Sequence, residues 1–163
     1  MATSGVEVHE DAKTIMNDVK LRKQRYAIFK ISDDNKCIEV VKLDDSQEEI
    51  LVNLKESPVD SEKKTQKALE LLHAKLNDNP SEPRYMYFNY VCDKGGRVLD
   101  KNILFHYNPD NGKIKHKMLY SSSKDALKKV TPASFVDLHI TEAGDLIDFK
   151  ELKTQIISKS GST

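Results

Sequence analysis

Residues 113–130, KIKHKMLYSSSKDALKKV, carry two apolar faces if they form a helix. At about 100° per residue, one side holds Leu119, Ala126 and Val130, with Tyr120 and Leu127 at its edge. The opposite side holds Ile114 and Met118, surrounded by Lys115, Lys117, Ser121, Ser122 and Asp125. A helix that packs on its own domain needs only one apolar stripe. The second spot therefore predicts a surface that enters a groove on another protein, with lysines directed at acidic groups on its rim.

The alternative is a solvated basic helix in which Ile114 and Met118 are exposed by chance, because single exposed apolar residues are common. The beginning of the helix is well marked in both cases. Asn108–Gly112 has the composition of a turn, and we predict that Asp110 or Asn111 caps the helix N-terminus.

Length and charge exclude several classes of protein. The 163 residues suffice for one domain with a core and are too few for two ordinary domains. Basic and acidic residues number 26 each, so the chain as a whole has no attraction for nucleic acid or membrane surfaces. It has no apolar run of about 18 residues and no signal-peptide pattern, which predicts a cytoplasmic protein without a membrane span. We also expect it to be a monomer. Two isolated cysteines, Cys37 and Cys92, fit a reducing compartment.

Helical and strand periodicities alternate along the chain. Helices are predicted at 9–22, from a cap at Asp60 or Ser61 to about residue 76, at 113–130 and at 142–158, and strands at 26–31, 36–43, 84–92, 98–107 and 135–140. No firm element is predicted for residues 44–60. The order αββαββαβα predicts a single α+β domain in which a mixed sheet of about five strands has helices on both faces, as α/β/α layers. Residues 1–7 and 159–163 are predicted to be flexible tails.

The residue types that carry catalysis or bind cofactors are not grouped in this chain. No glycine-rich loop lies between a strand and a helix, so we predict no phosphate cradle and no cofactor. The five histidines are scattered without ligand spacing, which argues against a metal site. His106, within a strand, is predicted to be a surface or half-buried residue. Because nothing marks an activated nucleophile, a binding module is favoured over an enzyme.

Five segments support a family resemblance. Residues 113–129 closely resemble the long-helix motif of the actin-depolymerising factor/cofilin family, and Ser4–Val6, Asn17–Leu21, Arg25–Phe29 and Ile103–Asp110 match in place and order. The resemblance runs from residue 4 to about residue 157 and is absent from about 44 to 66, where the chain looks longer than is typical. It implies one ADF-homology domain that binds actin monomers and filament subunits and promotes filament depolymerisation.

The resemblance also implies roles for individual residues. Lys115 and Lys117 match the basic pair that contacts actin, and Ile114 and Met118 match the apolar part that enters a cleft between two actin subdomains. The implied contact set further includes Ser4, Gly5, Val6, Ser121, Ser122 and Asp125. Ser4 matches a serine whose phosphorylation switches the family off. A phosphate adds about −1.5 to −2 charges, which would repel an acidic actin surface.

A second contact, used only on filaments, would involve Arg97, Lys101, Lys150 and Lys153. Leu99 stands where a basic residue is often found, and residues 154–157 (TQII) replace an arginine-rich ending. Monomer binding is therefore implied more strongly than severing. The family also implies phosphoinositide regulation, here through Lys115, Lys117, Lys128 and Lys129. The alternative is a glia maturation factor-like regulator of the actin-nucleating complex, which residues 95–98 (GGRV) slightly resemble, whereas Ser4–Val6 and Ser123–Ala126 favour cofilin.

Overall fold

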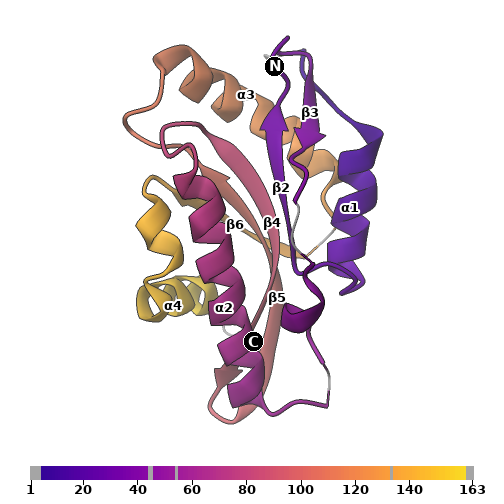
Figure 1. Cartoon of the computed structure of the whole chain (residues 1–163), viewed down its shortest axis with the longest axis vertical. Coiled ribbons are helices and arrows are strands. Elements are labelled where there is room, and N and C mark those ends of the chain that lie inside the picture. The colour runs from indigo at the N-terminus through magenta and orange to yellow at the C-terminus, as the bar shows by residue number, and fades with distance from the viewer. Residues whose placement is uncertain (1–4, 44–45, 54, 133, 161–163) are drawn as a thin grey trace.

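The computed structural model describes residues 5–43, 46–53, 55–132 and 134–160. These residues form one six-stranded sheet with the strand order β1-β3-β2-β4-β5-β6 (Figure 1). The strands are β1 (Glu7–Val8), β2 (Tyr26–Ile31), β3 (Cys37–Val40), β4 (Arg84–Lys94), β5 (Arg97–Tyr107) and β6 (Phe135–Ile140). The α-helices are α1 (Glu10–Lys20), α2 (Pro58–Asn77), α3 (Ile114–Val130) and α4 (Phe149–Lys159), with short 3-10 helices η1 (Glu48–Ile50) and η2 (Ala143–Leu146).

The hairpin of β4 and β5 is the centre of the sheet. Its strands pair antiparallel along their whole length, from Arg84 opposite Tyr107 to Lys94 opposite Arg97. Gly95 and Gly96 make the turn with φ angles of 61° and 86°, which residues with a Cβ rarely adopt. Because β4 pairs antiparallel with β2 and β5 pairs parallel with β6, the sheet is mixed, as predicted.

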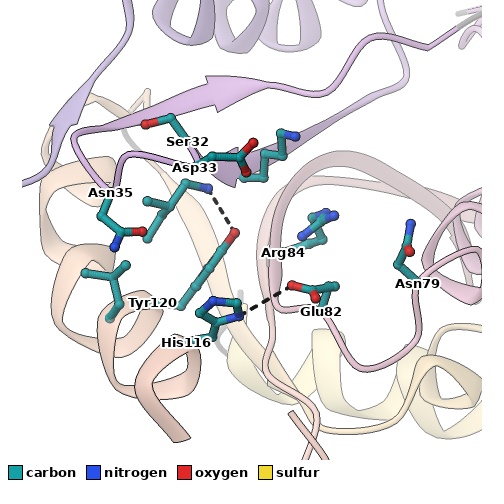
Figure 2. Close-up of a pocket in the computed structure, with 11 residues that line it drawn as sticks. Ser32, Asp33, Asn35, Asn79, Glu82, Arg84, His116 and Tyr120 are labelled. Carbon is teal, nitrogen blue, oxygen red and sulfur yellow. Dashed lines mark hydrogen bonds and ion pairs between the residues drawn. The ribbon is translucent and has the colours of Figure 1, made fainter. Parts of the chain in front are cut away.

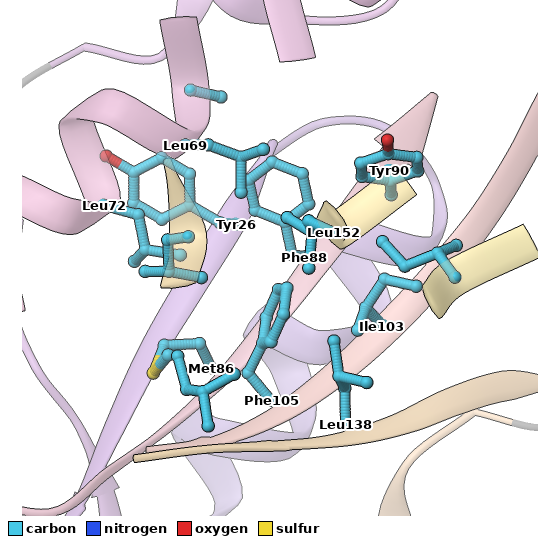
Figure 3. Close-up of a cluster of buried hydrophobic side chains, with 14 of the residues drawn as sticks. Tyr26, Leu69, Leu72, Met86, Phe88, Tyr90, Ile103, Phe105, Leu138 and Leu152 are labelled. Atoms are coloured by element: carbon cyan, nitrogen blue, oxygen red, sulfur yellow. The ribbon is translucent and has the colours of Figure 1, made fainter. Parts of the chain in front are cut away.

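Side chains alternate across each strand, so the sheet supports a separate core on each face. Under α2 and α4 lies a cluster built around Tyr26, Phe88 and Phe105, which Figure 3 shows with Leu69 and Leu152 packed against them. On the opposite face, α1 and α3 cover a second cluster that includes Met16, Phe29, Tyr87, Leu104 and Leu127. The predicted α/β/α layers of a single domain are thereby confirmed (Figure 1).

A buried arginine fixes the segment for which the sequence predicts no firm element. The guanidinium of Arg25, 1% exposed, donates hydrogen bonds to the carbonyl oxygens of Asn89 (2.7 Å) and Ile50 (2.8 Å) and to the hydroxyl of Thr65. The side-chain oxygen of Gln47 accepts from the backbone N–H of Arg25 at 2.6 Å. Burial lowers the pKa of Arg25 to about 10, so the group stays charged at neutral pH.

The sheet contains one strand more than predicted. Glu7 and Val8 pair in parallel with Cys37 and Ile38, and Val6 is buried. The predicted flexible tail of residues 1–7 is therefore wrong for residues 6 and 7, while residues 1–4 lie outside the described residues. A strand of two residues is too short to show alternation in the sequence. At the other end, α4 includes Lys159, which was predicted to begin the C-terminal tail.

Helix boundaries also differ where capping decides them. Ser57 caps α2 by accepting from the N–H of Asp60, and Pro58 occupies the first turn, where its missing N–H costs nothing. The predicted caps Asp60 and Ser61 therefore lie inside the helix. Helix α3 has no side-chain cap, so neither Asp110 nor Asn111 caps it. The predicted final helix is divided into η2 and α4, with Asp148 as the cap of α4.

Replacing Arg25 tests how much this network stabilises the fold. We expect Arg25→Ala to lower the free energy of unfolding by about 3 kcal/mol or more, because several buried hydrogen-bond partners lose their donor. Urea unfolding followed by circular dichroism measures the change. The exposed Lys23→Ala variant is the control and should stay within about 0.5 kcal/mol of wild type. Equal stabilities for the two variants would contradict the assigned role of Arg25.

Candidate protein-docking site on helix α3

The inner face of α3 is fixed to the sheet. Its buried residues are Tyr120, Ser123 and Leu127. The hydroxyl of Tyr120 accepts a hydrogen bond from the N–H of Ile31 at 2.9 Å, and the carbonyl oxygen of Tyr120 accepts one from the hydroxyl of Tyr85. The centre of the buried face is thus rotated from the predicted stripe of Leu119, Ala126 and Val130, which are only partly buried. A small serine at the contact lets the helix backbone approach the sheet.

The outer face presents the predicted apolar spot. Ile114 is 75% exposed and Met118 is 67% exposed, the highest values among the large apolar side chains of the described residues. Their predicted exposure is confirmed. Ser121, Ser122 and Asp125 around them are also exposed. Because these neighbouring side chains are short, Ile114 and Met118 protrude from the helix and form, with Lys115 and Lys117, what we call the α3 docking surface.

The lysines of α3 divide into two groups. Lys115 and Lys129 are exposed and make no hydrogen bond or ion pair with another described residue. The Nζ atom of Lys117 lies 4.0 Å from the carboxylate of Asp110, which is 87% exposed, so this pair is weak and screened by solvent. These three ammonium groups remain able to meet a partner's carboxylates.

Lys124 and Lys128 are held within the chain instead. They contact the Asp137 carboxylate at 2.6 and 3.3 Å. Burial alone would raise the pKa of Asp137, but the two ammonium groups outweigh it and hold this pKa below its usual value. Of the four lysines implied in phosphoinositide binding, Lys128 is therefore already paired.

The N-terminal residues reach the same region of the molecule. Strand β1 lies against α3, and the exposed Gly5 precedes this strand by two residues. Val6, predicted to contact a partner, is only 6% exposed and belongs to the core, so its side chain is not available for that contact. Ser4, the predicted phosphorylation site, lies outside the described residues.

The residues predicted for a filament-only contact lie on other elements. Arg97 is exposed beside the β4–β5 turn, Lys101 is half-buried on β5, and Lys150 is exposed on α4. Lys153 forms an ion pair with Glu62 at 2.6 Å, and this hydrogen bond raises the pKa of Lys153. Leu99, which stands at a position that is often basic, is nearly buried in the core under α2 and α4.

Asn108 is a site residue that sequence reasoning missed. Its amide nitrogen donates to the Ser121 hydroxyl at 3.2 Å and lies 3.4 Å from the Lys117 carbonyl oxygen, so it fastens the preceding loop to α3. It lies at the start of the predicted turn 108–112, but its burial could not be read from the turn composition.

In the described part of the chain, no group of His, Cys, Asp and Glu residues could hold a metal ion. None of the described helices is long and apolar enough to cross a lipid bilayer.

A domain that fixes one face of a helix to its sheet and exposes an apolar spot beside lysines on the other face has the features of a protein-binding domain. Residues 5–156 match the family described as cofilin/tropomyosin-type actin-binding proteins. The chain belongs to this family.

Individual relatives agree with this assignment. The chain is 29% identical over 157 residues to a cofilin of Gibberella zeae, covering 94% of this chain and 95% of that protein. Its fold is similar to Plasmodium berghei actin depolymerization factor 2, with a TM-score of 0.74, 25% identity and coverage of 97% and 99%. It is also similar to ADF/cofilin from Trypanosoma brucei, with a TM-score of 0.65, 31% identity and coverage of 97% and 98%. These relatives do not favour the glia maturation factor alternative.

His106, predicted at the surface or half-buried, is in fact 3% exposed, because β5 is covered on both faces where it pairs with β6. The pKa of His106 is lowered to about 4 from its ordinary 6.5, mainly by burial and in addition by the charges of Lys124 and His139, against the opposing charge of Asp137. Folded His106 is therefore neutral between pH 4 and 6.5, where the unfolded chain binds a proton.

Stability should consequently fall as the pH is lowered from 6.5 to 4. We expect His106 to contribute about 3 kcal/mol of this loss, which corresponds to the difference between the two pKa values. Urea unfolding at several pH values measures it. In His106→Gln the pH dependence over this range should be weaker by that amount, whereas an unchanged slope would show that other groups cause it.

Proposed function

We propose that this protein binds actin through the α3 docking surface and promotes the depolymerisation of actin filaments in the cytoplasm. The exposure of Ile114 and Met118 carries the proposal. The inner face of α3 already supplies the packing that the fold needs, so the outer apolar spot has no role in folding. Membership of an actin-binding family supports actin as the partner.

The physical basis is burial of a small apolar spot together with charge complementarity at its rim. Ile114 and Met118 enter an apolar groove on actin, and Lys115 and Lys117 meet carboxylates beside it. Binding that is tighter to one conformation of the actin subunit shifts the population toward that conformation and loosens the filament. This mechanism makes and breaks no covalent bond, so we assign no catalytic step to the protein.

The proposal gives less weight to side-on filament contacts. Lys153 is engaged with Glu62, and Leu99 is nearly buried, which leaves Arg97, Lys101 and Lys150 as the available basic groups of that set. We therefore assign monomer binding and subunit release to the protein and leave severing out of the proposed activity.

Two double variants test the α3 docking surface. Lys115→Ala/Lys117→Ala and Ile114→Ser/Met118→Ser should each weaken binding to actin monomers by on the order of 2–5 kcal/mol if the contacts are buried. Monomer-binding titration and filament sedimentation measure the loss. Lys20→Ala/Lys63→Ala, which removes two exposed lysines from other helices, is the matched control and should bind like wild type. Unchanged affinity in both folded test variants would refute the proposal.

A further inference from the structure

A polar pocket of about 300 Å³ opens beside the N-terminal half of α3, next to the α3 docking surface. Three segments that are far apart in the sequence meet there: the end of β2 with the turn that follows it, the loop between α2 and β4, and α3 itself (Figure 2). No role was predicted for this pocket, because its wall is assembled only by the fold.

Arg84 is a cation of the pocket that forms no ion pair with another described residue. It is the first residue of β4, half-buried, and Figure 2 shows its side chain inside the pocket. One of its N–H groups donates to the carbonyl oxygen of Pro83 at 2.7 Å. No carboxylate among the described residues lies within ion-pair distance of it, since the Glu82 carboxylate is directed at His116, 3.5 Å away. A guanidinium has five donors, so several remain for a ligand.

Tyr120 supplies a second donor on the pocket wall. Its hydroxyl oxygen accepts a hydrogen bond from the N–H of Ile31 and lies near the guanidinium of Arg84, so the lone pairs of this oxygen already face hydrogen-bond donors. Burial raises the pKa of Tyr120, which keeps the hydroxyl protonated at neutral pH. The hydroxyl proton, which donates to no other described residue, is therefore available to an acceptor in the pocket.

The pocket lies along a flank of α3 that adjoins Lys115 of the α3 docking surface. Leu119 lines the pocket, and Lys115 precedes it by four residues on the same side of the helix. Lys30 lies on the opposite rim and has only a long contact of 3.9 Å with Glu39. Two cationic groups, Lys30 and Arg84, thus line the pocket, and Lys115 lies beside it on α3.

We propose that the pocket receives an acidic side chain, Asp or Glu, of the actin subunit that docks on α3. Its carboxylate binds the guanidinium of Arg84 and the hydroxyl of Tyr120. This inference rests on the proposed function, because the docked subunit delivers the carboxylate. The flat guanidinium fork matches the two oxygens of a carboxylate.

Because the rim of the pocket also carries negative charges, a carboxylate binds there only when a docked partner holds it in place. Asp33 and Glu82 line the same pocket and offset Lys30 and Arg84, so a free anion gains little from entering. A side chain that is held in place by the rest of an interface has a much higher effective concentration. The pocket therefore adds to the affinity for a docked protein without trapping small anions.

The test compares substitutions at two neighbouring residues of opposite charge: one removes the positive charge of Arg84 and the other removes the negative charge of Glu82. Arg84→Gln should weaken binding to actin monomers by about 10-fold or more, because a charge-assisted bond is lost at the interface. Glu82→Gln, which removes a competing carboxylate, should bind as tightly as wild type or tighter. Arg84→Lys keeps the charge without the fork and should fall between wild type and Arg84→Gln. Thermal unfolding checks that all variants are folded.

A second measurement keeps the inference testable if Arg84→Gln is unstable. Carbodiimide joins ammonium and carboxylate groups that touch, so Arg84→Lys, which places an ammonium group in the pocket, should form a cross-link at position 84 to an acidic peptide of actin. Wild-type affinity in Arg84→Gln, or no cross-link at position 84 in an Arg84→Lys variant that binds actin, overturns the pocket inference. If Ile114→Ser/Met118→Ser still loses binding in that case, the proposed function stands. If wild type does not bind actin at all, both fall.

Discussion

The hydroxyl of Tyr120 determines how α3 is oriented on the domain. It accepts the N–H of Ile31, while the backbone carbonyl of the same residue accepts the hydroxyl of Tyr85, so the helix is fastened at one point to two strands. Rotating α3 to bury Ile114 and Met118 would leave a buried N–H without a partner, which is costly. The exposed apolar spot is thus a consequence of a buried polar contact.

The two helical layers of the domain contribute differently to folding and to binding. The core under α2 and α4 holds the larger cluster of aromatic and aliphatic side chains, and the Arg25 network fixes the segment around Gln47 next to it. The opposite layer carries the docking helix and the pocket beside it. Because each face of the sheet has its own core, substitutions on the outside of α3 leave the packing of both intact.

Periodicity was enough to predict the layers, the order of the elements and the exposure of Ile114 and Met118, because long amphipathic segments reveal their faces. The two-residue strand β1 and the contacts of Arg25 with Thr65 and Asn89 depend on residues distant in sequence, so no local pattern reports them. The same holds for the lysines. Asp137 pairs with Lys124 and Lys128, whereas Lys115 forms no ion pair with any other described residue, and only the fold decides this.

The short strand β1 has a practical consequence for labelled versions of the protein. Since it runs in the sheet beside β3 and against α3, the chain enters the domain next to the helix that we assign to actin. The last helix, α4, packs on the other face of the sheet (Figure 1). A fluorescent protein fused N-terminal to β1 would hinder access to the α3 docking surface, whereas one fused after α4 would leave this surface accessible.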